Sequence, residues 1–271
     1  MNIVLFLISA LAAVLILIIV GLSRVPKPFS AYSRKGTTLE TVELPPNLPA
    51  PVEHFYRQIY GERVPVITSA VLSGRASMRI NRIRMPGRWR FTHIAGQGYR
   101  HYIESTIFGL PFLKINEHYL DGKARLELPF GVVENEVKID SAANLGVWAE
   151  TVWLPAVFIT DPRVRWEAID ETTARLIVPW GGDKEQTFTV TFDTQTGMLK
   201  TLESLRYRDA NDEKEILWLN NVLDWSQVNG YTIPSPASVT WTDQRYAWAT
   251  FNVDEVVYNA DVSEYILATG K

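Results

Sequence analysis

The first apolar stretch of the chain is unbroken by any charge. From Ile3 to Leu22 every residue is apolar or small. At about 1.5 Å per residue, a helix of this length spans the roughly 30 Å hydrocarbon core of a bilayer. A secretory signal sequence would instead carry a basic start, a shorter apolar run and a small-residue cleavage site. The pattern therefore predicts an uncleaved transmembrane anchor over residues 1–23.

The next stretch has little apolar periodicity and several prolines, which predicts a stiff tether over residues 24–46. A single β-rich domain is expected over residues 47–271. It opens with a short helix whose apolar residues recur at helical spacing and which Gly61 can end. The residues of this stripe are Val52, Phe55, Tyr56, Ile59 and Tyr60, and His54 beside it is expected at the surface.

From Val66 onward, apolar and polar residues alternate with a period of two, and glycines separate the runs, which is typical of strands. In "GRWRFTHIAG" the alternation puts Trp89, Phe91 and His93 on one face. In "FLKINEHYLDGKARLELPF" the pair Asp121-Gly122 suits the tight turn of a hairpin. The pattern predicts an antiparallel meander of about ten strands.

One segment, "GVWAETVWLPAVF", interrupts this meander. Ser141 is a good N-cap and Pro155 prevents Leu154 from being helical, so a helix is expected from about Ala142 to Trp153. One broad face carries the apolar residues, and Glu150 lies at its edge. The apolar residues of that face are Leu145, Trp148, Ala149, Val152 and Trp153.

The fold class predicted from these patterns is mainly β, with a minor α+β character. We expect a large curved antiparallel sheet or half-barrel that carries the inserted helix on its concave face, preceded by one transmembrane helix.

Four segments carry a resemblance to a known family: "LPAPVEHFYR", "WAETVWLPAVFI", "VRWEAID" and "GYTIPSPASVTW". They resemble the successive landmarks of an uncharacterised prokaryotic family whose members have an N-terminal membrane segment and one β-rich domain of unknown function. The resemblance extends over roughly residues 46–258. The predicted topology is also similar to the half-barrel of lipoprotein-carrier proteins, whose concave apolar face holds acyl chains; fold alone does not imply function.

Composition excludes several functions. A net charge of −3 gives no general attraction to nucleic acid, and the absence of cysteine excludes disulfides, thiolate-bound zinc and thiol catalysis. The common nucleotide-binding, zinc-protease and serine-hydrolase motifs are missing. His93, His101 and His118 could meet from neighbouring strands, but they lack the spacing of metal ligands. We therefore predict no metal and no cofactor.

Two functions of different classes remain, beside a scaffold domain without a ligand. The first is binding of a lipid or another apolar molecule on the concave face, without chemistry. The residues expected to bind it are Trp148, Glu150, Val152, Trp153 and Trp166. The alternative is a membrane-anchored hydrolase that uses Glu150 and Asp170 as a carboxylate pair, with Glu167 near them.

The expected location is the cell membrane, through a single pass over residues 3–22. Arg24, Lys27, Arg34 and Lys35 follow the span, and basic flanks favour a cytoplasmic domain. The similarity to lipoprotein carriers favours the extracytoplasmic side instead, and we adopt that side as the expectation.

Overall fold

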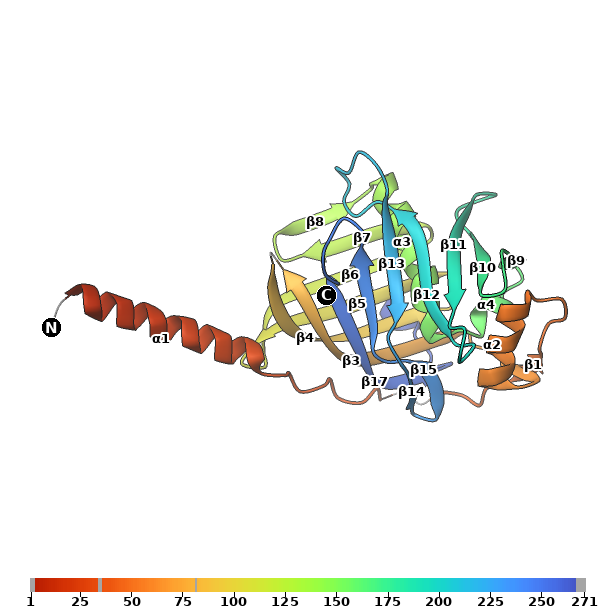
Figure 1. Cartoon of the computed structure of the whole chain (residues 1–271), viewed down its shortest axis with the longest axis horizontal. Coiled ribbons are helices and arrows are strands. Elements are labelled where there is room, and N and C mark those ends of the chain that lie inside the picture. Colours follow the sequence, from red (N-terminus) through yellow and green to blue (C-terminus); the bar gives the residue numbers. More distant parts are fainter. Residues whose placement is uncertain (1–2, 34–35, 81, 267–271) are drawn as a thin grey trace.

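The computed structural model describes residues 3–33, 36–80 and 82–266. Its main element is an antiparallel sheet of thirteen strands that curves without closing into a barrel (Figure 1). In spatial order the strands are β8 (Gly131–Glu134), β7 (Lys123–Leu128), β6 (Leu110–Leu120), β5 (Gly98–Ile107), β4 (Ile83–Ile94), β3 (Ser69–Ile80), β17 (Ala249–Tyr258), β16 (Ala237–Trp241), β13 (Ile216–Val222), β12 (Leu199–Arg206), β11 (Glu185–Phe192), β10 (Thr173–Pro179) and β9 (Arg165–Ala168). The predicted mainly β fold is confirmed.

The sheet consists of two meanders joined at its centre by the C-terminal strands. Within each meander, strands that follow one another in the chain are neighbours, as predicted. The join differs from a simple meander, because β17 pairs with β3 while β16 pairs with β13. Two short ribbons lie outside the sheet: β1 (Thr41–Glu43) with β2 (Arg63–Pro65), and β14 (Trp225–Val228) with β15 (Tyr231–Pro234).

The turns expected from sequence connect neighbouring strands. Leu120 pairs with Lys123 across Asp121-Gly122, and both turn residues have positive φ. Gly181 and Gly182 likewise have positive φ between β10 and β11. The first domain helix, α2 (Ala50–Tyr60), buries its predicted apolar stripe, and the Gly61 amide donates to the Arg57 carbonyl at its end.

The inserted helix, α3 (Val137–Glu150), begins five residues earlier than predicted, and a short 3-10 turn, η1 (Thr151–Trp153), follows it. Asp140 explains the early start, because its carboxylate accepts hydrogen bonds from the Lys123 ammonium and the Ala124 amide, both at 2.8 Å. This contact fixes the first turn of α3 to β7, so Ser141 lies inside the helix instead of capping it. The end is as predicted: Leu154, before Pro155, leaves helical geometry with φ −128°.

Helix α3 lies inside the curve of the sheet (Figure 1), and every residue from Ile139 to Ala149 is buried. Leu145 and Trp148 belong to the main core, whereas Ile139 and Val147 pack with tyrosines of β5 and β6. A helix that is buried on all sides has no solvent face. It is therefore part of the core of the domain and fills much of the concave side.

Helix α1 (Ile3–Ser23) is long and apolar enough to cross a membrane, and it extends away from the domain (Figure 1). Residues 27–32, within the segment predicted as a tether, lie along the face of the sheet opposite α3. There Phe29 packs on Tyr102, with 5.8 Å between ring centroids, and the Tyr32 amide donates to the Glu255 carboxylate at 2.9 Å. Two further short helices are α4 (Val157–Thr160) and α5 (Ser263–Ile266).

Candidate functional site

A cavity of about 100 Å³ lies between the end of α3 and the concave face of the sheet. Strands from both meanders contribute to it, as do α3 and η1. Its wall is mostly aromatic and aliphatic, with a small number of polar side chains. The aromatic residues of the wall are Phe91, Tyr99, Trp153, Trp218, Trp248 and Phe251.

His101 is at the centre of the polar part of this cavity. Strand register places His101 beside Phe91 on one side and Glu117 on the other. The imidazole stacks on the rings of Phe91 and Tyr99, each with 3.8 Å between centroids. Its Nδ1 lies 2.7 Å from Oε1 of Glu117, and its Nε2 lies 2.7 Å from Oε2 of Glu150. Two carboxylates therefore hold both ring nitrogens of one buried imidazole.

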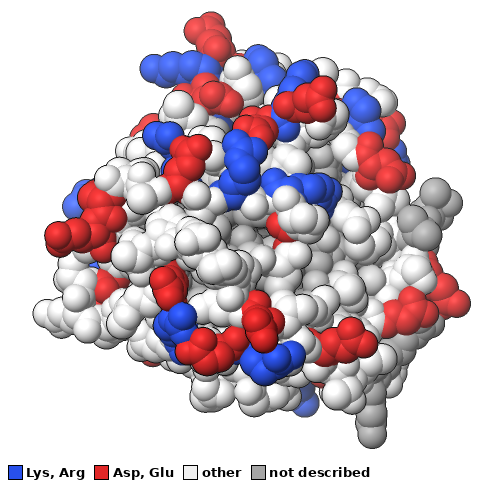
Figure 2. Space-filling view, turned by 90° about the vertical axis from the view of Figure 1, so that its right-hand side faces the viewer, with Lys and Arg blue, Asp and Glu red and all other residues white. Residues whose placement is uncertain are grey.

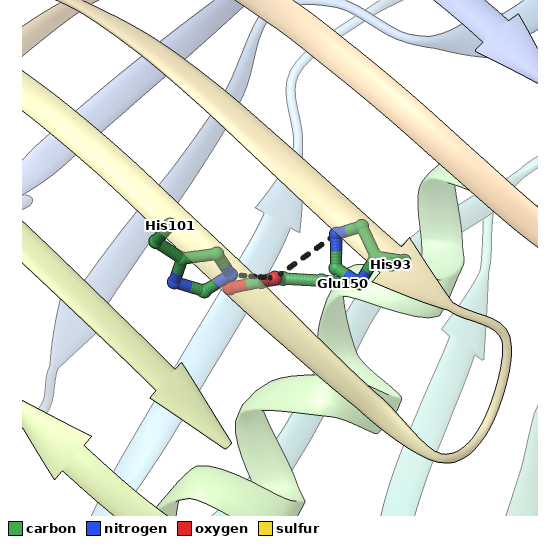
Figure 3. Close-up of side chains that lie close together, drawn as sticks. All are labelled: His93, His101 and Glu150. Carbon is green, nitrogen blue, oxygen red and sulfur yellow. Dashed lines mark hydrogen bonds and ion pairs between the residues drawn. The ribbon is translucent and has the colours of Figure 1, made fainter. Parts of the chain in front are cut away.

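A second histidine reaches the same carboxylate oxygen. His93 on β4 is 1% exposed, and its Nε2 lies 3.4 Å from Oε2 of Glu150. Within the part of the chain that the structure describes, this nitrogen has no hydrogen-bond partner. Figure 3 shows the Glu150 carboxylate between the two imidazoles. The three ligand-type atoms of His93, His101 and Glu150 all lie within 4.8 Å of one another.

The pKa shifts in this group follow from burial and from the neighbouring charges. Burial lowers the pKa of His101, but the carboxylates of Glu150 and Glu117 outweigh it and raise that pKa to about 9. Burial lowers the pKa of His93, and the charge of His101 lowers it further. Burial also raises the pKa of Glu150. These shifts favour the protonated form of His101 and the neutral form of His93 at pH 7.

Arg206 supplies another positive charge at the cavity. Its guanidinium carbon lies 4.4 Å from the centroid of the Trp218 ring, and its Nε donates to the Ala142 carbonyl at 2.9 Å. Burial lowers its pKa, but a guanidinium remains charged in proteins. The polar end of the cavity thus combines two carboxylates with an imidazolium and a guanidinium.

The residues predicted to bind a ligand lie in three environments. Glu150, Val152 and Trp153 line the cavity. Trp148 is 1% exposed and lies outside the cavity, with Gly96 and the Arg163 guanidinium close to its ring. Trp166 on β9 is half-buried outside the cavity, where its Nε1 donates to the Phe158 carbonyl at 3.1 Å.

The predicted carboxylate pair is not brought together in the cavity. Asp170 is exposed in the turn between β9 and β10, where its carboxylate accepts from the Thr172 amide at 2.8 Å. Glu167 is also exposed and pairs with Arg175 at 3.1 Å. The carboxylate that approaches Glu150 is that of Glu117, with the His101 ring between them.

Of the three histidines that were expected to be able to meet, His93, His101 and His118, the structure brings only the first two together. His118 is on β6 one residue beyond Glu117, so its side chain points to the opposite face of the sheet. Glu117, Arg206 and Trp248 are among the cavity residues that the sequence did not single out. The one signal for Glu117 was its place on the same strand face as Tyr119.

The surface provides no single-sign charged patch on the face shown in Figure 2. Lysine and arginine side chains alternate there with aspartate and glutamate around an uncharged centre.

A family model described as "Family of unknown function (DUF6544)" matches residues 38–252. A search of curated proteins gives no match.

Solved structures similar to the chain include a DUF1329 family protein from Desulfovibrio piger, with TM-score 0.45, 10% identity, and coverage of 81% of this chain and 98% of that chain. A LolA superfamily protein from Nitrosomonas europaea has TM-score 0.45 and 9% identity, over 82% of this chain and 99% of that chain. A domain from Vibrio parahaemolyticus, described as a "putative outer membrane lipoprotein-sorting protein domain", has TM-score 0.40 and 9% identity. The match covers 71% of this chain and 86% of that chain. No activity is transferred from them.

Proposed function

This chain belongs to the DUF6544 family of unknown function, and we propose that it is a membrane-anchored protein that binds an amphiphilic, lipid-like molecule in the cavity beside α3. The single observation that carries this proposal is the composition of the cavity. An aromatic wall meets a buried ionic group at one end, in a cavity on the concave side of the sheet. Ligand sites typically combine a mostly apolar lining with a few convergent polar groups in this way.

The polar groups in the cavity indicate the chemistry of the ligand's polar end. Trp218 and Trp248 both line the cavity, and their indole Nε1 atoms are buried without a hydrogen-bond partner among the described residues. Buried donors of this kind normally have an acceptor. Together with the Arg206 guanidinium, they suit a ligand whose polar end accepts hydrogen bonds, such as a carboxylate, phosphate or ester.

The volume of the cavity limits the size of the ligand group that can enter it. A protein cavity of about 150 Å³ holds one benzene molecule, and this cavity is about 100 Å³. A complete acyl chain is larger than that. The ligand would therefore place one short apolar group against the aromatic wall, and the rest of it would extend from the cavity mouth.

Features at one end of the domain support membrane anchoring. The Phe108 amide donates to the Gly21 carbonyl at 2.8 Å, so the turn between β5 and β6 lies against the end of α1. Phe108, Leu110 and Phe112 of this hairpin are exposed. Exposed apolar side chains beside a membrane-spanning segment are suited to contact with the bilayer. We propose that this hairpin enters the membrane interface.

We propose the extracytoplasmic side for the domain, because a binding protein for amphiphiles can shield them in the aqueous space outside the membrane. Arg24 and Lys27, directly after α1, favour the opposite orientation. Protease treatment of intact spheroplasts separates the two. Digestion of the domain supports the proposal, and a domain protected until the cells are lysed contradicts it.

The binding proposal is tested by what copurifies with the full-length protein. The parent protein and the variants Trp248→Ala and Trp180→Ala are extracted in a non-ionic detergent, washed equally and analysed for lipids by mass spectrometry. Trp248 is in the cavity wall, whereas Trp180 lies outside it beside Lys184. We expect one class of amphiphile to be retained by the parent and by Trp180→Ala and to be lost from Trp248→Ala. Equal retention by all three proteins would contradict binding in the cavity.

A further inference from the structure

We propose that His93, His101 and Glu150 form a binding site for one divalent transition-metal ion, with zinc as the expected occupant. This inference goes beyond ligand binding in the cavity and does not depend on it. It rests on the arrangement of three donor atoms from three different elements: Nε2 of His93 on β4, Nε2 of His101 on β5, and Oε2 of Glu150 at the end of α3.

The donor set is one that transition metals prefer. Zinc sites with an open position use three protein ligands, and two histidines with one glutamate are a known combination. Ligands about 2.0–2.1 Å from a tetrahedral zinc ion lie about 3.3 Å from one another. The 3.4 Å between His93 Nε2 and Glu150 Oε2 already has that spacing. The 2.7 Å between His101 Nε2 and the same oxygen is a hydrogen bond; zinc would replace the proton in it, which is released to solvent, and a small rotation of the Glu150 side chain would make room for the ion.

His93 gives the second, independent observation. Its Nε2 is buried, points at the shared carboxylate oxygen and has no hydrogen-bond partner within the described residues. An unpaired buried polar atom normally costs about 1–3 kcal/mol of stability. A metal ion between the three groups would give this nitrogen a partner.

The surroundings also favour a cation at this point. Glu117 binds Nδ1 of His101 at 2.7 Å, and a carboxylate on the outer nitrogen of a metal-bound histidine is a common orienting contact. Glu150 is the last residue of α3, where the helix carbonyls produce a negative potential, and the last turn of α3 has no basic residue. The helix end and the second carboxylate therefore both favour a positive ion at the Glu150 carboxylate, against the repulsion from the Arg206 guanidinium.

The position of the site leaves it accessible. His101 and Glu150 both line the cavity, so an ion held by them would be reached from the cavity. A fourth ligand, from water or from the polar end of a bound molecule, could approach from that side.

The test uses the full-length protein, purified in detergent without a histidine tag and treated with a chelator. Zn²⁺ is titrated by calorimetry, and Co²⁺ is added separately to record the visible absorption of the bound ion. The variants are His93→Gln, Glu150→Gln and Glu117→Gln, with His118→Ala and His54→Ala as controls outside the cluster. Thermal melting of each variant shows whether it is folded.

The parent protein should bind one Zn²⁺ per chain, and Co²⁺ should give the intense visible bands of a tetrahedral site. Glu117→Gln should weaken the affinity by about 10–100-fold, the usual effect of losing an orienting contact to a ligand. Glu150→Gln and His93→Gln should lose more, and the two controls should bind as the parent does. If the parent binds no stoichiometric Zn²⁺, or if Glu150→Gln is folded and binds it unchanged, the three groups share a proton and the metal site is refuted. If His93→Gln does not fold, Glu150→Gln decides the matter.

Discussion

His101 and Glu150 are 49 residues apart in the chain and lie 2.7 Å apart through Nε2 and Oε2. This contact joins the centre of the first meander to the end of the helix inside the sheet. The His101 ring stacks on Phe91 and Tyr99, which restricts its position on β5. The pair therefore fixes the position of the helix end and, with it, the shape of the cavity that both residues line.

Glu150→Gln should keep the fold while changing what the cavity binds. Glutamine has the same shape and can still hydrogen-bond to His101, but it removes the charge that faces the imidazolium. We expect a loss of about 1–3 kcal/mol in the free energy of unfolding, as for a weakened buried polar contact. Copurified ligand should decrease or change its polar group. Glu167→Gln, in an exposed ion pair, is the control and should match the parent in both measurements.

Trp148→Ala and Trp153→Ala should both lower stability strongly. Trp148 is 1% exposed and Trp153 is 4% exposed, and removing a buried tryptophan costs roughly 3–5 kcal/mol. Only Trp153 lines the cavity, so only Trp153→Ala should also reduce ligand binding directly. Denaturant titration and retained ligand, measured at a temperature where both variants are folded, check this. A direct effect of Trp148→Ala on binding would place the ligand elsewhere.

Deleting residues 1–23 should give a soluble, folded protein, because within the described residues α1 is the one helix long and apolar enough to cross a membrane. Deleting residues 1–43 should lower the free energy of unfolding further, since it also removes β1 and the packing of Phe29 on Tyr102. We expect the second deletion to cost roughly 1–2 kcal/mol more, less than the value for a fully buried large side chain, because Phe29 is half-buried. Fractionation and thermal melting compare the two. Equal melting temperatures would show that residues 24–43 contribute no stability.

The exposed hairpin tip should bind lipid without α1. In the protein lacking residues 1–23, Phe108, Leu110 and Phe112 remain available. Changing Leu110 and Phe112 to serine should reduce sedimentation with liposomes several-fold, since each exposed side chain would lose its apolar contact with the bilayer. Changing the exposed Leu205 and Leu223 to serine provides the control. If both double variants sediment alike, the hairpin does not contact the membrane.

Local patterns predicted much of the fold. Alternation in "GRWRFTHIAG" placed Trp89, Phe91 and His93 on one face, and Asp121-Gly122 located a hairpin, because both depend on neighbouring residues only. The predicted start of α3 was wrong, because the observed start depends on contacts of Asp140 with β7, which is distant in the chain.

The candidate site was harder to predict for the same reason. The alignment of His101 with Glu117 requires the register of β5 on β6, which shifts at a bulge between Ser105 and Thr106. The approach of Glu150 requires the end of α3 to lie over β4 and β5. Neither relationship produces a characteristic spacing in the sequence, so the sequence pattern did not distinguish these histidines from ordinary strand residues.

The most direct test of cavity binding is photochemical labelling with an acyl analogue that carries a diazirine at the end of its chain. After irradiation of the full-length protein in its membrane, the labelled peptides are identified by mass spectrometry. Binding in the cavity predicts labels on the segments that contain Phe91, Trp153 and Phe251, and their loss in the cavity-filling variant Val239→Phe. Labels confined to residues 3–23 and 108–112, unchanged by Val239→Phe, would contradict it.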